Sequence, residues 1–116
     1  MNWNSLTDIS QLENIKAESF KQPVLILKHS TTCSISGTAL NRLERNWKQE
    51  KVGELKPYYL DLLKNRPLSA EIASIFDVEH QSPQVLLIKD GVCTYSATHF
   101  DISFAEIERF TVDGEG

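Results

Sequence analysis

The chain has 116 residues, of which 41% are apolar and 24% charged, a composition typical of one compact soluble domain. Collagen, coiled coil and wholesale disorder are excluded, and the longest apolar runs of four residues are far short of the ~20 that a membrane span needs. The net charge of −4 argues against binding to a nucleic-acid backbone. We therefore expect a single domain over 1–116, frayed at 114–116, with neither nucleic-acid nor membrane partners.

The first half of the chain predicts a helix, a strand and a second helix. Apolar residues at 6, 9, 12 and 15 recur at helical spacing, and a capping box at Ser10 supports a helix over 8–20. The apolar run at 24–27 has no polar alternation, which is typical of a central strand covered on both faces. A polar turn over 29–32 then leads into a long helix that begins around Cys33.

The second half predicts three further strands, the last two joined in a hairpin, and two helices. In chain order these are a strand over 58–62, a helix from Pro67 to about Asp77, strands over 85–88 and 92–97, and a helix opened by Asp101 or by a capping box of Ser103 and Glu106. Asp90-Gly91 between the last two strands is a hairpin signal. This order predicts an α/β sandwich of three layers (α/β/α), with helices on both faces of a central mixed four-stranded sheet.

Cys33 lies where the first strand meets the long helix. A cysteine in the first turn of a helix is close to unpaired N–H groups and to the positive end of the helix dipole, and both favour thiolate over thiol. Ser36, three residues on, is expected to face the same side and to donate a hydrogen bond to the sulfur. Cys33-Ser34-Ile35-Ser36 therefore predicts a monothiol redox turn, in which an external thiol must resolve any disulfide. A buried and inert cysteine is the alternative reading.

Three other residues near this turn are candidates for the site. Pro83 follows a polar turn and precedes a buried strand, where a cis bond would hold the backbone of Ser82 open beside Cys33, although trans is the ordinary form. Lys28 ends a buried strand, so its charge must reach solvent or a partner. We expect Lys28 either to contact an anion or simply to extend to solvent. His29 is close enough to Cys33 in sequence to modulate its charge.

Neither the cysteines nor the histidines have the spacing of a metal site. Cys93 lies just beyond the predicted hairpin, roughly 20 Å from Cys33 by the rise of the strand, so we expect it to be a spectator thiol. The three histidines share no ligand spacing with one another, so we expect no metal and no tightly bound cofactor. No basic stretch followed by an apolar core and a cleavage site is visible, and we expect a cytoplasmic protein.

The segment Leu27-Lys28-His29-Ser30-Thr31-Thr32-Cys33-Ser34-Ile35-Ser36 resembles the monothiol bacilliredoxins, a bacterial thioredoxin-like family of the bacillithiol redox system. That family typically has Lys-His-Ser-Thr-x-Cys-Pro-Ile-Ser at this junction, and its length and element order agree with the whole chain. The departure is Ser34, where the usual Pro would stiffen the first helical position. The resemblance implies a thioredoxin-like fold, a nucleophile at Cys33 supported by Thr32 and Ser36, a cis bond at Pro83, and pairing of Ser82 with substrate.

The resemblance also implies an activity, which is removal of bacillithiol from mixed disulfides on client proteins. The Cys33 thiolate would attack the bacillithiol sulfur and release the client thiol, and a second bacillithiol, a low-molecular-weight thiol co-substrate, would resolve the adduct. Bacillithiol carries carboxylates, so the site needs hydrogen-bond donors. The amides of the first helical turn, the backbone of Ser82 and Lys28 are the candidates.

Other functions fit parts of the same pattern. An arsenate-reductase-like thiol enzyme also places Cys-x-x-Ser after a strand, but it needs an arginine-type oxyanion partner, whereas Gly37 follows Ser36 here. A cluster-binding monothiol glutaredoxin would have Cys-Gly-Phe-Ser. A non-enzymatic thioredoxin-like adaptor or redox sensor would keep the fold without a reactive thiolate, and a Cys33 thiol that stays protonated at neutral pH would favour that class.

Overall fold

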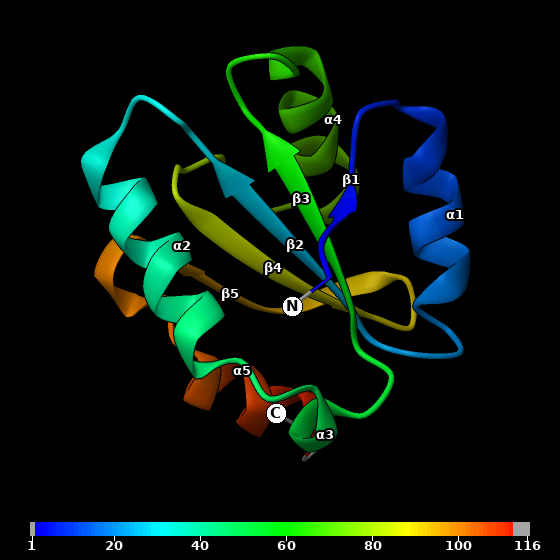
Figure 1. Cartoon of the computed structure of the whole chain (residues 1–116). Helices are drawn as coiled ribbons and strands as arrows, with labels where there is room; N and C mark the ends of the chain where they lie inside the picture. The colour runs from blue at the N-terminus through cyan, green and yellow to red at the C-terminus, as the bar shows by residue number, and fades with distance from the viewer. Residues whose placement is uncertain (1, 113–116) are drawn as a thin grey trace.

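A computed structural model of the chain describes residues 2–112, so the predicted fraying of 114–116 lies outside the described residues. Helices and strands alternate along most of this length (Figure 1). In chain order the elements are β1 (Asn4–Ser5), α1 (Ser10–Glu18), β2 (Val24–His29), α2 (Ser34–Asn46), α3 (Gln49–Val52), β3 (Lys56–Asp61), α4 (Arg66–Phe76), β4 (Gln84–Lys89), β5 (Val92–Thr98), the 3-10 helix η1 (His99–Asp101) and α5 (Phe104–Val112).

The central sheet has five strands in the order β1-β3-β2-β4-β5. The β1–β3 and β3–β2 pairs are parallel, whereas β2–β4 and β4–β5 are antiparallel. The mixed character was predicted, but the count of four strands was wrong, because β1 was missed. With only two residues, β1 shows no alternation in the sequence, and it is fixed by pairing of Asn4 with Tyr58 and by the bond from Leu6 N to Tyr59 O at 2.9 Å.

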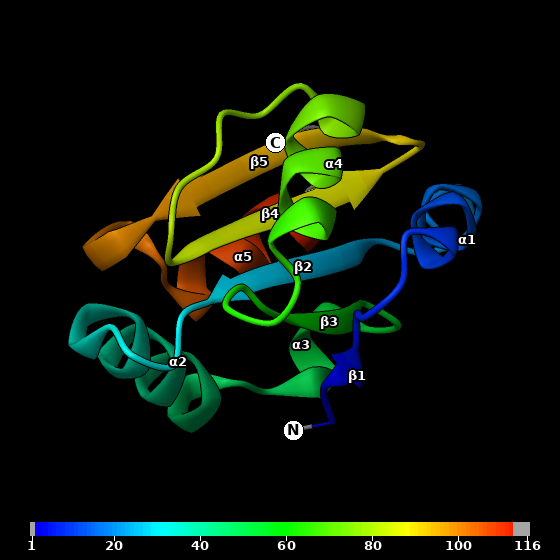
Figure 2. The same ribbon diagram turned by 90° about the horizontal axis from the view of Figure 1, so that it is seen from above.

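Helices cover both faces of the sheet and make the expected three layers (Figures 1 and 2). The apolar core is accordingly divided in two: α1 and α4 pack on one face, and α2, α3 and α5 on the other. Alternate residues of β2 serve the two halves, Val24 and Ile26 on the α1/α4 side and Leu25 and Leu27 on the α2/α5 side. All six residues of β2 are buried, which confirms the prediction of a central strand.

The predicted helix boundaries are close to the observed ones, but one predicted cap is wrong. Ser10 is the first residue of α1 and no side-chain cap is formed there. Instead, the side chain of Gln11 accepts hydrogen bonds from the backbone N–H groups of Thr7 and Asp8 at 2.8 and 2.9 Å. The hydrogen bonds that lead the chain into α1 are therefore made at Thr7 and Asp8, two to three residues before the predicted cap at Ser10.

The C-terminal half follows the prediction more closely. Asp90 and Gly91 both have positive φ, 52° and 81°, which confirms the tight hairpin turn between β4 and β5. At α5 the hydroxyl of Ser103 accepts a hydrogen bond from Glu106 N at 3.2 Å, so of the two predicted helix starts Ser103 is the correct one. The short elements α3 and η1 were not predicted, because three or four residues carry no periodicity.

Candidate functional site

Cys33 occupies the N-cap of α2, at the edge of the sheet where β2 ends. Its thiol is free and half-buried, and its side chain makes no cap hydrogen bond. The backbone on both sides is tied down, by Cys33 N to Ser30 O at 3.2 Å and by Gly37 N to Cys33 O at 3.1 Å. The first-turn N–H groups of a helix have no intrahelical partners, so the sulfur lies in the positive field of the helix start.

The Ser82-Pro83 segment lies at the same edge of the sheet. It directly precedes Gln84, the first residue of β4, and Gln84 pairs with Lys28 near the end of β2 (Figures 1 and 2). The Ser82-Pro83 bond is cis, as the family resemblance implied. The hydroxyl of Ser82 is buried and has no hydrogen-bond partner among residues 2–112, and the carbonyl of Pro83 accepts a bond from His99 N at 3.1 Å.

The hydroxyl of Ser36 has partners other than the expected sulfur. Ser36 is fully buried, and its oxygen lies 2.6 Å from Nδ1 of His29 and accepts a 3.1 Å bond from Ser30 N. Within the described range 2–112 no hydrogen bond joins Ser36 to Cys33. The reason is directional: side chains in a helix lean toward its N-terminus, and at this position that direction leads into the junction with β2. Ser36 therefore fixes the start of α2 relative to the strand.

His29 is the site residue to which sequence reasoning gave too little weight. It is buried, with 6% of its surface exposed, and its ring packs 5.6 Å from the ring of Tyr59. Burial lowers the pKa of His29, and the Asp61 carboxylate, the hydrogen bond with Ser36 and the Glu44 carboxylate only partly oppose this. The imidazole is therefore neutral at neutral pH. The sequence signal for its importance was a histidine at the end of a strand that is mostly apolar.

Lys28 neither reaches solvent nor lies open to a substrate. It is fully buried under α4, where its ammonium donates to the carbonyl of Ser69 at 3.2 Å and lies 3.3 Å from Nδ1 of His80. Burial lowers the pKa of Lys28 to about 8. Both expectations for this residue, a contact with an anion and extension to solvent, are therefore wrong. The structure assigns it instead to the contact between β2 and α4.

The remaining predicted residues lie as follows. Thr32 is exposed in the turn before Cys33, with its hydroxyl 3.3 Å from that of Ser30. Cys93 is near the opposite edge of the sheet, where it pairs with Ile88 beside the hairpin turn. Its thiol donates to Tyr95 O at 3.3 Å, and burial raises its pKa. Its position away from Cys33 is the expected one, and its spectator role stays a prediction.

Residues 2–112 contain no cluster of three or more metal-ligating side chains, and no helix among them is long and apolar enough to cross a membrane. The family model described as monothiol bacilliredoxin BrxC matches residues 4–107. The chain belongs to this family.

Solved structures similar to this bacilliredoxin-family chain share its fold. A protein with a thioredoxin fold is 31% identical, with a TM-score of 0.77 over 90% of this chain and 89% of the other. The thioredoxin of Malassezia sympodialis is 10% identical, with a TM-score of 0.74 over 99% and 92% of the two chains. The thioredoxin of Fasciola hepatica is 14% identical, with a TM-score of 0.70 over 95% and 97%. These likenesses confirm the predicted thioredoxin-like fold, and family and fold together identify a redox protein.

Proposed function

We propose that this bacilliredoxin-family chain is a monothiol thiol–disulfide oxidoreductase that removes bacillithiol from mixed disulfides on cytoplasmic client proteins. The observation that supports it most directly is the free, half-buried thiol of Cys33 at the N-cap of α2. Its backbone is fixed on both sides, and a cis proline lies at the same sheet edge. A free thiol held at a helix start near a cis proline is placed to attack a disulfide that docks at this edge of the sheet.

The proposed cycle conserves atoms and electrons. The Cys33 thiolate attacks the bacillithiol sulfur of the mixed disulfide, a new sulfur–sulfur bond forms at Cys33, and the client cysteine leaves as its thiolate. A second bacillithiol thiolate attacks the bacillithiol sulfur of this adduct. Cys33 leaves as thiolate and the two small thiols depart as their disulfide. The client sulfur goes from the disulfide to the thiol level and the second bacillithiol sulfur from the thiol to the disulfide level, while the first bacillithiol sulfur stays at the disulfide level throughout.

Binding of bacillithiol in this cycle needs hydrogen-bond donors for its carboxylates. The first-turn amides of α2 are the donors on one side of Cys33, and the backbone at Ser82, next to the cis bond, is the donor on the other. Thr32, exposed one residue before the thiol, is a further hydroxyl within the turn. Lys28 is not among the donors, because its ammonium is buried against Ser69.

The test is intact-mass analysis after mixing the protein with a client that carries bacillithiol as a mixed disulfide. Wild type and Cys93→Ala should each gain the mass of one bacillithiol as the client loses it, whereas Cys33→Ala should gain nothing. Parallel clients capped with glutathione or coenzyme A show whether another small thiol serves instead. If no cap is transferred to wild type, the oxidoreductase proposal is wrong and a non-enzymatic adaptor or redox sensor becomes the better reading.

A further inference from the structure

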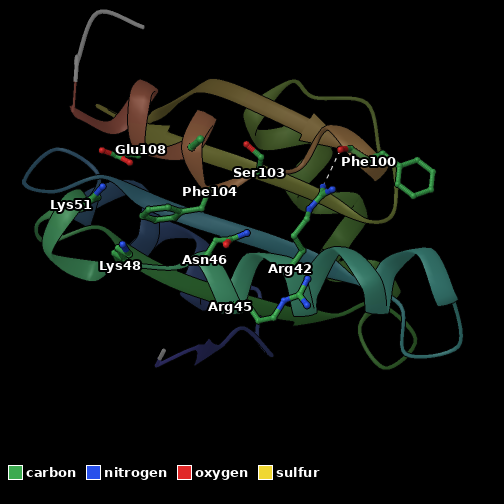
Figure 3. A pocket seen from close by; sticks show the side chains of 10 residues that line it. Arg42, Arg45, Asn46, Lys48, Lys51, Phe100, Ser103, Phe104 and Glu108 are labelled. Atoms are coloured by element: carbon green, nitrogen blue, oxygen red, sulfur yellow. Dashed lines mark hydrogen bonds between the residues drawn. The ribbon is translucent and has the colours of Figure 1, made fainter.

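A cavity of about 460 Å³ lies between the C-terminal half of α2, the α3 region and the start of α5 (Figure 3). We call it the α2–α5 groove. Its volume is within the range of sites that hold small molecules. Cys33 is outside it: Arg42, the lining residue nearest to Cys33 in sequence, lies nine residues further along the chain, about 13 Å at the helical rise. The proposed redox cycle makes no use of this groove.

Positive charge gathers in the groove although the chain as a whole has a net charge of −4. Four cationic side chains line it, those of Arg42, Arg45, Lys48 and Lys51, against the single carboxylate of Glu108 (Figure 3). Within residues 2–112 the ion pairs join other residues, and none of these four cations is paired there with a carboxylate. Like charges held together cost free energy, and a bound anion removes that cost.

Arg42 holds one wall of the groove in place. One of its terminal nitrogens donates to the carbonyls of Phe100, at 2.9 Å, and of Ile102, which fixes the guanidinium between α2 and the segment that includes η1. Its Nε atom is closed off from solvent and has no hydrogen-bond partner within residues 2–112, so Arg42 braces this wall and an anion is left to the more exposed cations beside it.

The opposite wall includes the start of α5. Ser103, Phe104 and Ala105 line the groove, and the Ser103 hydroxyl already accepts the bond from Glu106 N. The earlier N–H groups of this nine-residue helix have no intrahelical partner, and the helix dipole adds partial positive charge at the same end. Cations on one wall and a helix start on the other are the arrangement that holds a tetrahedral oxyanion.

We propose that the α2–α5 groove binds a small phosphorylated molecule, whose doubly charged phosphate lies among Arg45, Lys48 and Lys51 and faces the start of α5. A small molecule fits better than a nucleic acid or an acidic peptide for two reasons. The four lining cations surround a single compact cavity on an acidic protein, and the Glu108 carboxylate repels a longer polyanion.

The test uses pyrophosphate as the probe, at constant ionic strength, with binding followed by amide chemical shifts or calorimetry. Wild type should bind one pyrophosphate saturably, with shifts at the start of α5 and the end of α2. The triple variant Arg45→Gln, Lys48→Gln, Lys51→Gln should bind at least tenfold more weakly. The control, Lys16→Gln, Lys21→Gln, Lys64→Gln, removes the same charge from exposed positions outside the groove and should lose less than twofold.

Three results would overturn the proposal: wild type shows no saturable binding of pyrophosphate, both triple variants lose affinity equally, or a glutamate-rich peptide binds where pyrophosphate does not. Tighter binding of a nucleoside diphosphate than of pyrophosphate would support it and would place an organic group beside the phosphate. Cys33→Ala should bind pyrophosphate like wild type, so the outcome is independent of the proposed redox function. Thermal unfolding of each variant verifies that the exposed substitutions leave the fold intact.

Discussion

The imidazole Nδ1 of His29 lies 2.6 Å from the hydroxyl oxygen of Ser36, and this contact joins the last residue of β2 to the first turn of α2. Both side chains are buried, and the same hydroxyl accepts the N–H of Ser30. Cys33 lies on the chain between the two ends of this link. The proposed nucleophile is therefore held by its backbone hydrogen bonds and by a polar pair on either side of it, and not by a hydrogen bond of its own side chain within residues 2–112.

Ser36→Ala should lower the free energy of unfolding by about 1–3 kcal/mol, because it leaves the buried N–H of Ser30 and the ring of His29 without a partner. Urea unfolding measures this, with Ser34→Ala, an exposed neighbour, as the control that should change little. In a double-mutant cycle with His29→Leu the two losses should be non-additive by at least about 0.5 kcal/mol. Additive losses would show that the pair contributes no coupling.

The fold should lose stability as the pH drops below neutrality, in part through His29. Burial lowers the pKa of His29 in the folded state, so as pH falls below about 6.5 the unfolded chain takes up the proton first and the folded state loses stability. His29→Gln keeps a polar group toward Ser36 but does not titrate. Urea midpoints measured from pH 7 to pH 5 should fall less steeply for His29→Gln, and parallel slopes would contradict the assignment.

Lys28 should give a dependence of the same sign on the alkaline side. Its folded pKa is about 8, against 10.5 for the free side chain, so between these values the unfolded state holds more protons and stability rises with pH. The gain should be roughly 1–3 kcal/mol and should vanish in Lys28→Met. Lys64→Met, at an exposed position, is the matched control and should keep the wild-type slope. A rise of the same size in Lys28→Met would assign the effect to other groups.

Two glycines should respond to alanine in opposite directions. Gly91 has φ of 81° in the hairpin turn, and an added Cβ would lie 2.9 Å from the ring of Phe20, so Gly91→Ala should destabilise by about 1 kcal/mol or more. Gly37 lies within α2 with open space around its Cβ position, and Gly37→Ala should stabilise by about 0.5–1 kcal/mol. Thermal unfolding of the two variants side by side measures both signs.

The sequence predicted the features that repeat along the chain and missed those that depend on a single contact across it. The buried run of β2 and the Asp90-Gly91 turn carry their own periodicity and turn chemistry, so both were predicted. The placement of Cys33 at a helix start followed from the same local pattern. β1 was missed because its two residues become a strand only through pairing with β3.

The errors at the site have the same origin. Helical spacing brings Ser36 toward the turn that carries Cys33, but its direction is decided by the acceptors and donors of β2, which spacing does not reveal. Lys28 was expected near solvent because burying an ammonium is costly. The structure meets part of that cost with the Ser69 carbonyl and His80, forty or more residues away in sequence, so no local pattern could have shown it.

Cys93 and Cys33 lie at opposite edges of the sheet, and this separation affects how fast capped Cys33 is regenerated in the proposed cycle. A capped Cys33 has no neighbouring sulfur that could discharge it, so the lifetime of the adduct is inversely proportional to the concentration of free small thiol. When that pool is full the protein returns to its reduced form quickly, and when the pool is depleted it accumulates in the capped form. The capped fraction of this chain then reports the thiol supply around it.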